Sequence, residues 1–432
     1  MEDLIVIGSG AMGLAAAYEA SKQGKKVTVI ESSNIPGGMA AHFNFSEISL
    51  ERFYHFVCET DIDTFDLLEE LGIDHKLTWK KTKSGYFYNN KLFKWGDPVA
   101  LLLAPGLNLY EKIRYGMFAF FQTKRTNWQK LENISATEWI KSWCGKSVYE
   151  KLWAPLFKLK FHEYSDNISA AWIWTRIKRI GVSRYSIFQE KLGFIEGGTE
   201  TLVAKLIEKI KENDGEIILS EPVTEINCEN NFAIVSTDTN SYKGLKVICT
   251  SPIQELPIIK PAFSDELSAQ YKSVKNIGVV CVVLSLSKKV TENFWLNISM
   301  PDWNIPGIIE FSNLRNFNKK NIVYIPYYMP TTNKLWERDN SVFIKESFDY
   351  IKQINPDICD EDLEDAFVGR LNHSQPICEP GFLKKIPSIQ TPHQHLQVAD
   401  TCYYYPEDRG ISESIKLGRL MAKNAIGALD NL

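Results

Sequence analysis

The first 31 residues show a pattern of apolar and polar positions that predicts a strand, a helix and a second strand. An uninterrupted apolar run at residues 4–7 is typical of a parallel strand that is buried on both faces. The stretch LAAAYEASKQG that follows at 14–24 predicts a helix that ends at Gly24. The next stretch, KKVTVIE, predicts a second strand that ends on Glu31. The chain therefore begins with a strand–helix–strand unit.

Two longer segments show different periodicities. Residues 61–189 contain four stretches with apolar positions at three- and four-residue steps, which predicts a helical unit: TFDLLEELG, EKIRYGMFAFFQTK, ATEWIKSWCG and SVYEKLWAPLF. Residues 256–389 alternate strands such as VVCVVLSLS and NIVYIPYY with helices such as VFIKESFDYIKQI. This second pattern predicts an antiparallel sheet that forms one wall of a ligand cavity.

Length and composition narrow the class of protein. A chain of 432 residues is too long for one small core, so two intertwined domains are expected. Hydrophobic residues make up 44% and charged residues 24%, which is ordinary for a globular protein. A net charge of -4 argues against a nucleic-acid partner, because such binding needs a basic surface.

Cysteine usage and the N-terminal residues indicate the cellular setting. Eight cysteines are scattered without a C-x-x-C pair, which argues against a disulfide framework and against a metal site. The opening residues lack the basic region of a signal peptide, and no run reaches about 18 uninterrupted apolar residues. We therefore expect a cytoplasmic protein without a membrane-spanning helix.

The turn between the first strand and the first helix carries a glycine motif. Gly8, Gly10 and Gly13 have the spacing G-x-G-x-x-G. In such a turn the first glycine permits the tight bend, the second lets the backbone approach a pyrophosphate, and the third lets helix and strand pack closely. Glu31, about 20 residues on, is placed to accept hydrogen bonds from a ribose, and an acid there argues against a 2′-phosphate. The motif predicts a dinucleotide site.

A second glycine pair distinguishes flavin from nicotinamide. Glu31 is followed by SSNIPGGMAAHF, so that Gly37 and Gly38 complete an E-x(5)-G-G pattern. This pattern resembles the GR2-type flavoproteins, the superfamily of amine oxidases, protoporphyrinogen oxidases, phytoene and other carotenoid desaturases and UDP-galactopyranose mutases. The resemblance implies that FAD is the cofactor and that the glycine pair lies along its pyrophosphate and ribityl chain, where only residues without side chains fit.

Three further segments resemble the same superfamily in the same order: residues 193–226, 246–256 and 398–425. The resemblance implies that Val223 lies on the adenine side and that Asp400 contacts the pyrophosphate or the ribityl hydroxyls. It also implies that a helix begins at 410–412 and faces the flavin. The implied cofactor contacts are Gly8, Gly10, Ala11, Met12, Gly13, Glu31, Ser32, Gly37, Gly38, Met39, Val223, Thr250, Asp400, Gly410, Ile411 and Ser412.

The position of these segments predicts the domain organisation. An α/β fold is expected, with a Rossmann-like FAD-binding domain built from the discontinuous segments 1–60, 190–255 and 390–432. The helical segment 61–189 would form a cap on the substrate side. The segment 256–389 would supply the sheet of an α+β substrate domain.

Three residues are candidates for catalysis. His55, in ERFYHFVCETD, matches the superfamily stretch that follows the glycine pair, and it could donate a hydrogen bond or move a proton beside the flavin. The alternative is a half-buried histidine that binds a backbone carbonyl. Lys160 and Arg176 belong to a basic and aromatic stretch, 152–180, and a cation there could stabilise the reduced ring or bind a substrate anion. The alternative is a solvated helix face.

Two stretches suggest further contacts. Residues 95–125 combine apolar runs with basic ends, and in this superfamily such segments sometimes contact membranes peripherally. A core helix has the same pattern. Residues 402–410, CYYYPEDRG, would bring an aromatic ring, for which Tyr404 is the candidate, close to the flavin.

The resemblance implies an FAD-dependent oxidoreductase that oxidises or desaturates a small organic substrate by hydride transfer to flavin N5. One alternative is a non-redox flavoenzyme that acts on a nucleotide sugar, as UDP-galactopyranose mutases do. A third possibility is a flavin-binding protein without catalysis that serves as a partner or assembly factor. The patterns in the chain indicate neither the identity of the substrate nor an oligomeric state.

Overall fold

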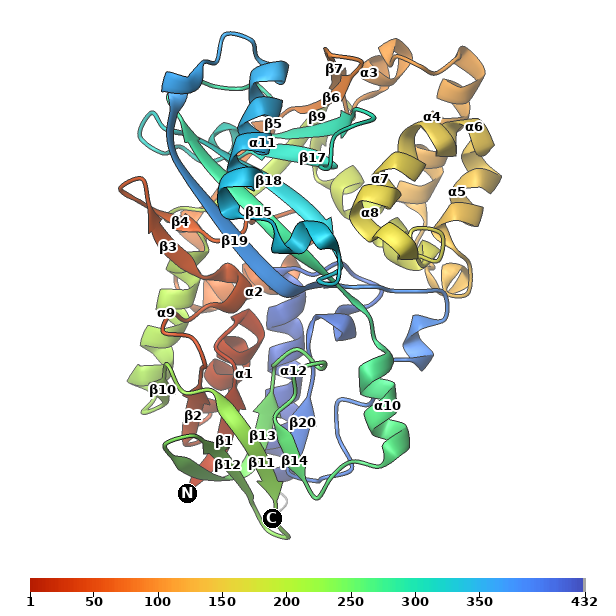
Figure 1. The fold of residues 1–432 in the computed structure, drawn as a ribbon. Helices are drawn as coiled ribbons and strands as arrows, with labels where there is room; N and C mark the ends of the chain where they lie inside the picture. Colours follow the sequence, from red (N-terminus) through yellow and green to blue (C-terminus); the bar gives the residue numbers. More distant parts are fainter. Residues whose placement is uncertain (430–432) are drawn as a thin grey trace.

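Two large β-sheets organise the molecule, and the computed structural model describes residues 1–429 of it (Figure 1). The first sheet lies in the lobe that holds both ends of the described chain, and its strand order is β10-β2-β1-β13-β12-β11-β14, with β20 beside β13. The second sheet lies in the other lobe, with the order β19-β15-β18-β17-β16-β6-β7. This α/β architecture confirms the predicted fold class.

The centre of the first sheet is parallel and buried. Strand β1 (Glu2–Ile7) pairs in parallel with β2 (Val27–Ile30) and with β13 (Ser241–Cys249). Further parallel partners are β10 (Glu216–Ile218) on β2 and β20 (Leu396–Val398) on β13. Because both faces are covered, these strands are nearly continuous apolar runs. The sheet thus joins segments that lie almost 400 residues apart.

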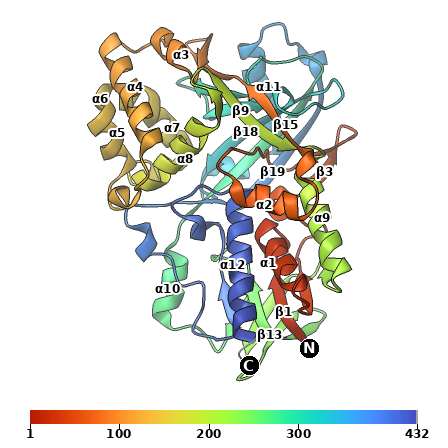
Figure 2. The same cartoon turned by 180° about the vertical axis from the view of Figure 1, so that it is seen from behind.

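Three helices pack side by side on one face of this sheet (Figure 2). Helix α1 (Ala11–Ser21) lies between α9 (Thr199–Glu212) and α12 (Ile411–Leu429). The closest approach is at Gly418, where an added Cβ would lie 2.2 Å from the carbonyl oxygen of Met12. The alanine-rich sequence of α1 is therefore explained by close helix packing rather than by amphipathic exposure, and its alanines after Ala11 are fully buried.

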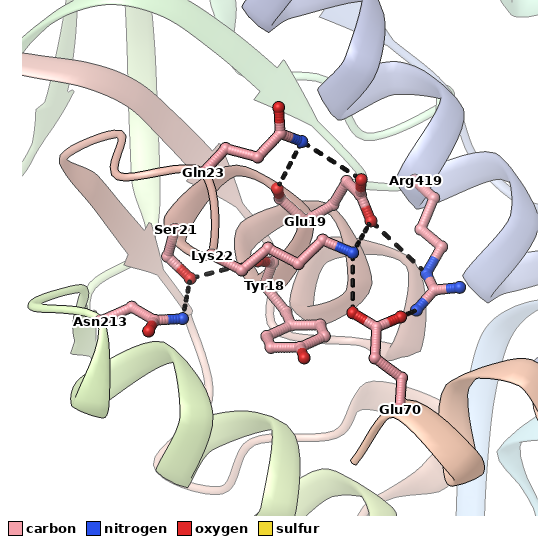
Figure 3. A network of polar contacts seen from close by, with 8 residues as sticks. All are labelled: Tyr18, Glu19, Ser21, Lys22, Gln23, Glu70, Asn213 and Arg419. Carbon is pink, nitrogen blue, oxygen red and sulfur yellow. Dashed lines mark hydrogen bonds and ion pairs between the residues drawn. The ribbon is translucent and has the colours of Figure 1, made fainter.

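A charged network ties α1 to α12 and to α2 (Ile62–Glu70) (Figure 3). Lys22 contacts the carboxylates of Glu19 and Glu70 at 2.7 Å each. Arg419 of α12 contacts the same two carboxylates, at 3.7 Å in the case of Glu19. Two cations and two carboxylates thus alternate where three helices meet, and α2 is held in the first lobe although it lies in the predicted cap segment.

The second sheet confirms the predicted antiparallel sheet. Strand β15 (Asn276–Leu286) pairs antiparallel with β18 (Asn321–Met329) and with β19 (Leu363–Pro376). The sheet continues through β17 (Gly307–Glu310) to β16 (Trp295–Ser299), which pairs in parallel with β6. Helix α11 (Asn340–Ile354) packs on this sheet, so that the opposite face is left for the cavity.

The segment 61–189 is not helical throughout, and this corrects the prediction. Residues 77–95 form β5 (Leu77–Thr82), β6 (Ser84–Tyr88) and β7 (Lys91–Trp95). Asn89 and Asn90, both at positive φ, close the tight hairpin between β6 and β7. An Asn-Asn turn between two short runs rich in aromatic residues is a hairpin signal that outweighs the helical pattern of the flanking stretches.

The remaining elements complete the two lobes. The helices of the cap are α3 (Pro98–Leu103), α4 (Leu109–Lys124), α5 (Ala136–Cys144), α6 (Lys146–Val148), α7 (Ala154–Phe161) and α8 (Ala170–Val182). A three-stranded sheet joins β5 to β9 (Gln189–Ile195) and β8 (Arg184–Ser186). The other elements are β3 (His42–Phe45), β4 (Ile48–Glu51), β11 (Val223–Cys228), β12 (Ala233–Thr237), β14 (Ile258–Lys260) and α10 (Asp265–Ser273). Because β14 pairs with β11, the first sheet extends past residue 255.

The packing of α12 on α1 yields a stability prediction. We expect Gly418→Ala to lower the free energy of unfolding by about 1–3 kcal/mol, because the added methyl group meets backbone that cannot move aside. Gly427→Ala in the same helix is the matched control, because a Cβ there meets no atom of residues 1–429 within 4 Å and alanine favours the helix by about 1 kcal/mol. Urea unfolding followed by tryptophan fluorescence measures both, and equal midpoints for the two variants would contradict this packing.

Candidate functional site

A cavity of about 780 Å³ lies between the two lobes. Its lining comes from the carboxyl ends of β1, β2 and β13, from the second sheet, and from α7, α8 and the start of α12. The crevice outside the carboxyl ends of parallel strands is where open α/β sheets bind ligands. The volume lies within the usual range for ligand sites.

The first glycine motif combines two packing positions with one open position. An added Cβ at Gly8 would lie 2.5 Å from Oγ1 of Thr250, and one at Gly13 would lie 1.9 Å from the carbonyl oxygen of Gly8. These two glycines therefore hold β1, α1 and β13 together. A Cβ at Gly10 would meet no atom within 4 Å, and Gly10 lines the cavity. The space over Gly10 is thus available to a ligand.

The N-terminus of α1 opens into the cavity. Its N-cap residue is Gly10, which provides no side-chain cap, and the first turn carries no acidic residue. Ala11 and Met12 of this turn line the cavity. Because the first N–H groups of a helix lack partners within the helix and the dipole is positive there, this end suits a phosphate group.

The second glycine pair lies directly against the first motif. The N–H of Gly37 donates to the carbonyl of Ser9 at 3.0 Å, and Gly37 forms a parallel bridge with Gly10. A Cβ on Gly38 would lie 3.1 Å from Cα of Gly10. Gly37 and Gly38 have φ values of 111° and 57°, which side chains disfavour. The two clusters form one backbone surface, here called the glycine platform (Gly8–Gly10 with Gly37 and Gly38), which fits an extended dinucleotide.

Glu31 is fixed at the edge of the glycine platform. Its carboxylate accepts hydrogen bonds from the N–H and the hydroxyl of Ser9, each at 2.8 Å, and from the N–H of Ser33 at 2.8 Å. It also lines the cavity. Glu31 therefore joins the end of β2 to the turn after β1. Its contact with a ribose remains a prediction.

Asp400 and Thr250 connect the other strand ends. Asp400 is buried, and its carboxylate accepts from the N–H of Cys402 at 2.8 Å and from the N–H of Ile253 at 3.0 Å. Burial raises the pKa of Asp400, although these two hydrogen bonds oppose the shift. Thr250 donates its hydroxyl to the carbonyl of Ile7 at 2.8 Å. Both side chains line the cavity while they hold its turns in place.

The cavity brings together all but three of the predicted cofactor contacts. Gly13 is absent from the lining because it packs against Gly8. Val223 begins β11 outside the lining. Ser412 is buried, and Ser414 lines the cavity in its place, with its hydroxyl 2.8 Å from the hydroxyl of Tyr404. Val223 and Ser412 therefore lie outside the cavity lining, and their contacts with FAD stay predictions.

His55 lines the cavity in a nonpolar setting. Its Nδ1 atom is buried and has no hydrogen-bond partner among the described residues. Burial is the main cause that lowers the pKa of His55 to about 4. The imidazole is therefore neutral at pH 7, and the unpartnered ring nitrogen is available to a ligand.

Lys160 and Arg176 lie together with two residues that the sequence reasoning did not single out, Asp408 and Arg409. Arg176 contacts Asp408 at 2.6 Å and lies over the ring of Trp172 at 4.1 Å. Arg409 donates from Nη1 to the side-chain oxygen of Gln375 at 2.6 Å. We name this set the cation cluster (Lys160, Arg176 and Arg409 with Asp408). The stretch EDRG, which ends at the helix entry Gly410, was the sequence signal for Asp408 and Arg409.

Only one of the three consecutive tyrosines at 403–405 lines the cavity, and it is the predicted one, Tyr404. Tyr405 points toward the cap instead, where its hydroxyl is 2.8 Å from that of Ser169, and its ring lies 5.3 Å from that of Phe382. Because the backbone forms a 3-10 turn at Thr401–Tyr404, these consecutive side chains point in different directions.

Comparisons with known proteins agree with the resemblance. The family model described as flavin containing amine oxidoreductase matches residues 13–364. A 15-cis-phytoene desaturase from Narcissus pseudonarcissus is 21% identical over 299 residues. That match covers 64% of this chain and 52% of the desaturase, so the chain spans about half of that relative's length.

Solved structures share the fold at low identity. A proposed protoporphyrinogen oxidase from Exiguobacterium sp. 255-15 superposes with a TM-score of 0.76 at 16% identity, covering 98% of each chain. Cyclohexylamine oxidase from Brevibacterium oxydans IH-35A superposes with a TM-score of 0.74 at 12% identity, covering 99% of each chain. The superpositions extend over both lobes.

The open position at Gly10 yields a prediction. We expect Gly10→Val to fold and to lose bound FAD, because φ of -64° accepts valine while the side chain would fill the space over the glycine platform. The ratio of visible to ultraviolet absorbance after gel filtration measures retention, and circular dichroism reports folding. Gly427→Val, outside the cavity lining, is the matched control. A Gly10→Val protein as yellow as the parent would contradict the assignment of this space.

Proposed function

The chain belongs to the flavin-containing amine oxidoreductase family, and on that premise we propose that it is an FAD-dependent enzyme that oxidises or desaturates a small organic substrate. FAD is the cofactor that membership in this family implies. The observation that carries the proposal is that the glycine platform, His55 and the cation cluster line the same cavity. When bound, FAD would supply a hydride acceptor at N5.

Particular residues would hold the cofactor. The N-terminus of α1 and the glycine platform would bind the pyrophosphate, with Glu31 beside the ribose. Gly410 and Ile411 line the cavity at the start of α12, where the positive end of the helix favours negative charge on the isoalloxazine. Asp400 keeps these turns at a fixed separation through its two backbone hydrogen bonds.

The chamber beyond the glycine platform favours hydride transfer because it is largely apolar. Aromatic and aliphatic side chains come from α7, α8 and the second sheet, among them Phe157, Ile173, Phe294 and Trp295. Such a lining excludes water from the reacting atoms. Most of the charged side chains in the lining are paired with one another, among them Asp61 with Arg179 and Glu190 with Arg184.

The three candidate catalytic residues take different roles in this proposal. His55 presents a neutral imidazole nitrogen without a protein partner, which can orient a substrate through a hydrogen bond. Burial, and then the charge of Arg176, lower the pKa of Lys160 to about 7, so that this amine can hold or release a proton near neutral pH. Arg176 is held by Asp408 and keeps a fixed positive charge at the chamber wall.

Anaerobic reduction of the purified holoprotein tests the proposed activity. We expect a flavin spectrum that an organic donor bleaches without added reductant and that oxygen or an artificial acceptor restores. Turnover of a nucleotide sugar only after prior reduction, with no acceptor consumed, would contradict the proposal and indicate a mutase. A bound flavin that neither an organic donor nor light reduces, and that does not act on a nucleotide sugar, would contradict the proposal and indicate a binding protein without catalysis.

A peripheral membrane contact is also proposed, on the surface of α3 and α4. No helix within residues 1–429 is long and apolar enough to cross a bilayer. On α4, however, large apolar side chains are exposed at three- and four-residue steps, and Leu103 at the end of α3 is 74% exposed. The exposed set on the two helices is Val99, Leu102, Leu103, Leu109, Tyr110, Ile113, Met117, Phe120 and Phe121. A stripe of this kind suits the acyl boundary of a bilayer.

Charge and position favour an anionic bilayer as the occupant of this apolar stripe. The segment 91–125, which carries the stripe, also contains the basic residues Lys91, Lys94, Lys112, Arg114, Lys124 and Arg125. The two acids in the same region are engaged, Asp97 as the N-cap of α3 and Glu111 in the capping box of α4 and with Lys151. Trp95 and Gly96, directly before α3, line the cavity. A substrate dissolved in the membrane would therefore enter close to the contact.

Vesicle sedimentation tests this contact. We expect the parent to pellet with phosphatidylcholine vesicles that contain a quarter phosphatidylglycerol, and Met117→Glu/Phe120→Glu to stay in solution, because two charges would enter the acyl boundary. Ile258→Glu/Val342→Glu, which changes exposed apolar residues elsewhere, is the matched control. A parent that does not pellet, or a parent dimer that only the first double variant dissociates, would contradict the proposal.

A further inference from the structure

We infer that the substrate of this enzyme carries a carboxylate, which Arg409 and Lys160 bind, and that it is not a free cationic amine. The inference rests on the proposed function and specifies its substrate class. It starts from the balance of charge in the cavity. Three cations, Lys160, Arg176 and Arg409, surround the single carboxylate of Asp408. Oxygen Oδ1 of Asp408 already accepts from Arg176 and from the backbone N–H of Arg409.

The other carboxylates that line the cavity are also engaged. Each one accepts from an arginine or from backbone N–H groups, as the contacts of residues 1–429 show. The pairs are Glu51 with Arg315, Asp61 with Arg179, and Glu190 with Arg184, while Glu31 and Asp400 accept from backbone N–H groups. A protonated amine that entered this cavity would therefore find no free counter-ion, and burying an uncompensated charge is costly.

Two cations, in contrast, lack a carboxylate partner in the described part of the chain. Among the described residues neither Lys160 nor Arg409 forms an ion pair, although the charge of Asp408 acts on both. The guanidinium of Arg409 donates to the neutral amide of Gln375 and hydrogen-bonds the Tyr328 side chain. Both flank one aromatic ring, Tyr328 of β18, at 5.2 Å for Nζ of Lys160 and 5.9 Å for the guanidinium of Arg409. All three residues line the cavity. An anion over Tyr328 could therefore reach both cations.

The titration of Lys160 supports this assignment. Burial, followed by the charges of Arg176 and Arg409, lowers the pKa of Lys160 to about 7, while the charge of Asp408 opposes the shift. The cluster thus holds more positive charge than its surroundings stabilise. A bound anion would reverse this effect, raise the pKa of Lys160 and keep the amine protonated. Anion affinity should then be highest below pH 7 and fall as the pH rises above 7, because Lys160 loses its proton in the free enzyme.

The probes for the test are benzoate, benzylamine and benzamide, which share one ring and differ in charge. They are titrated against the oxidised holoenzyme, and the shift of the visible flavin spectrum gives each dissociation constant. We expect benzoate to bind and the other two to give no saturable shift at pH 6. Because binding is measured without turnover, this result is independent of the proposed oxidation. If no donor reduced the flavin, the proposed function would be overturned, but the inferred anion site would not.

Variants connect the binding to the two cations. We expect Arg409→Met and Lys160→Met each to weaken benzoate binding by about tenfold or more, the loss of one charged hydrogen bond. Lys160→Met should also remove the decline above pH 7. Lys158→Met is the matched control, because Lys158 is an exposed lysine of the same helix outside the cavity lining.

Two results would overturn the inference. One is saturable binding of benzylamine that exceeds that of benzoate. The other is benzoate affinity that is unchanged in both variants while the flavin reduction potential falls in Arg409→Met, which would show that the cations serve the reduced ring instead.

Discussion

The architecture depends on an approach of backbone to backbone that leaves no room for side chains. Where β1 ends, a Cβ at Gly13 would overlap the carbonyl of Gly8, and a Cβ at Gly38 would press on Gly10. These contacts draw α1, the loop at 37–38 and the end of β13 to one point. These contacts form the glycine platform, whose exposed surface faces the cavity. A dinucleotide is the kind of ligand whose length and charge match a helix N-terminus beside such a surface.

The same convergence explains why distant segments must cooperate. The helices around α1 meet through Gly418 and through the alternating charges of Glu19, Lys22, Glu70 and Arg419, so that the first lobe is closed by its last helix. The second sheet and the cap then supply the chamber walls. Both lobes thus contribute residues to the lining of one cavity.

Local sequence predicted the part of the site that depends on backbone geometry. Glycine spacing, the apolar run before it and the acid at Glu31 are local signals, and the structure places them together. The strands at 77–95 were missed because the helical periodicity of the neighbouring stretches was extended over them, although Asn89 and Asn90 mark the turn between β6 and β7. Asp408 and Arg409 were missed because their importance arises from Arg176 and Lys160, more than 230 residues away. Pairings of that range are fixed by tertiary packing, which no local pattern encodes.

The discontinuous lining of the cavity has a consequence for biosynthesis. Gly8, the first lining residue, is synthesised about 400 residues before Ser414, the last one. At roughly 5–20 residues per second, this separation is a delay of tens of seconds. Throughout that interval the nascent chain presents a phosphate-binding turn without the β20 and α12 segments that complete the enclosure. The enclosure of the cavity is therefore complete only after the last segment of its lining has been synthesised and has packed against the first.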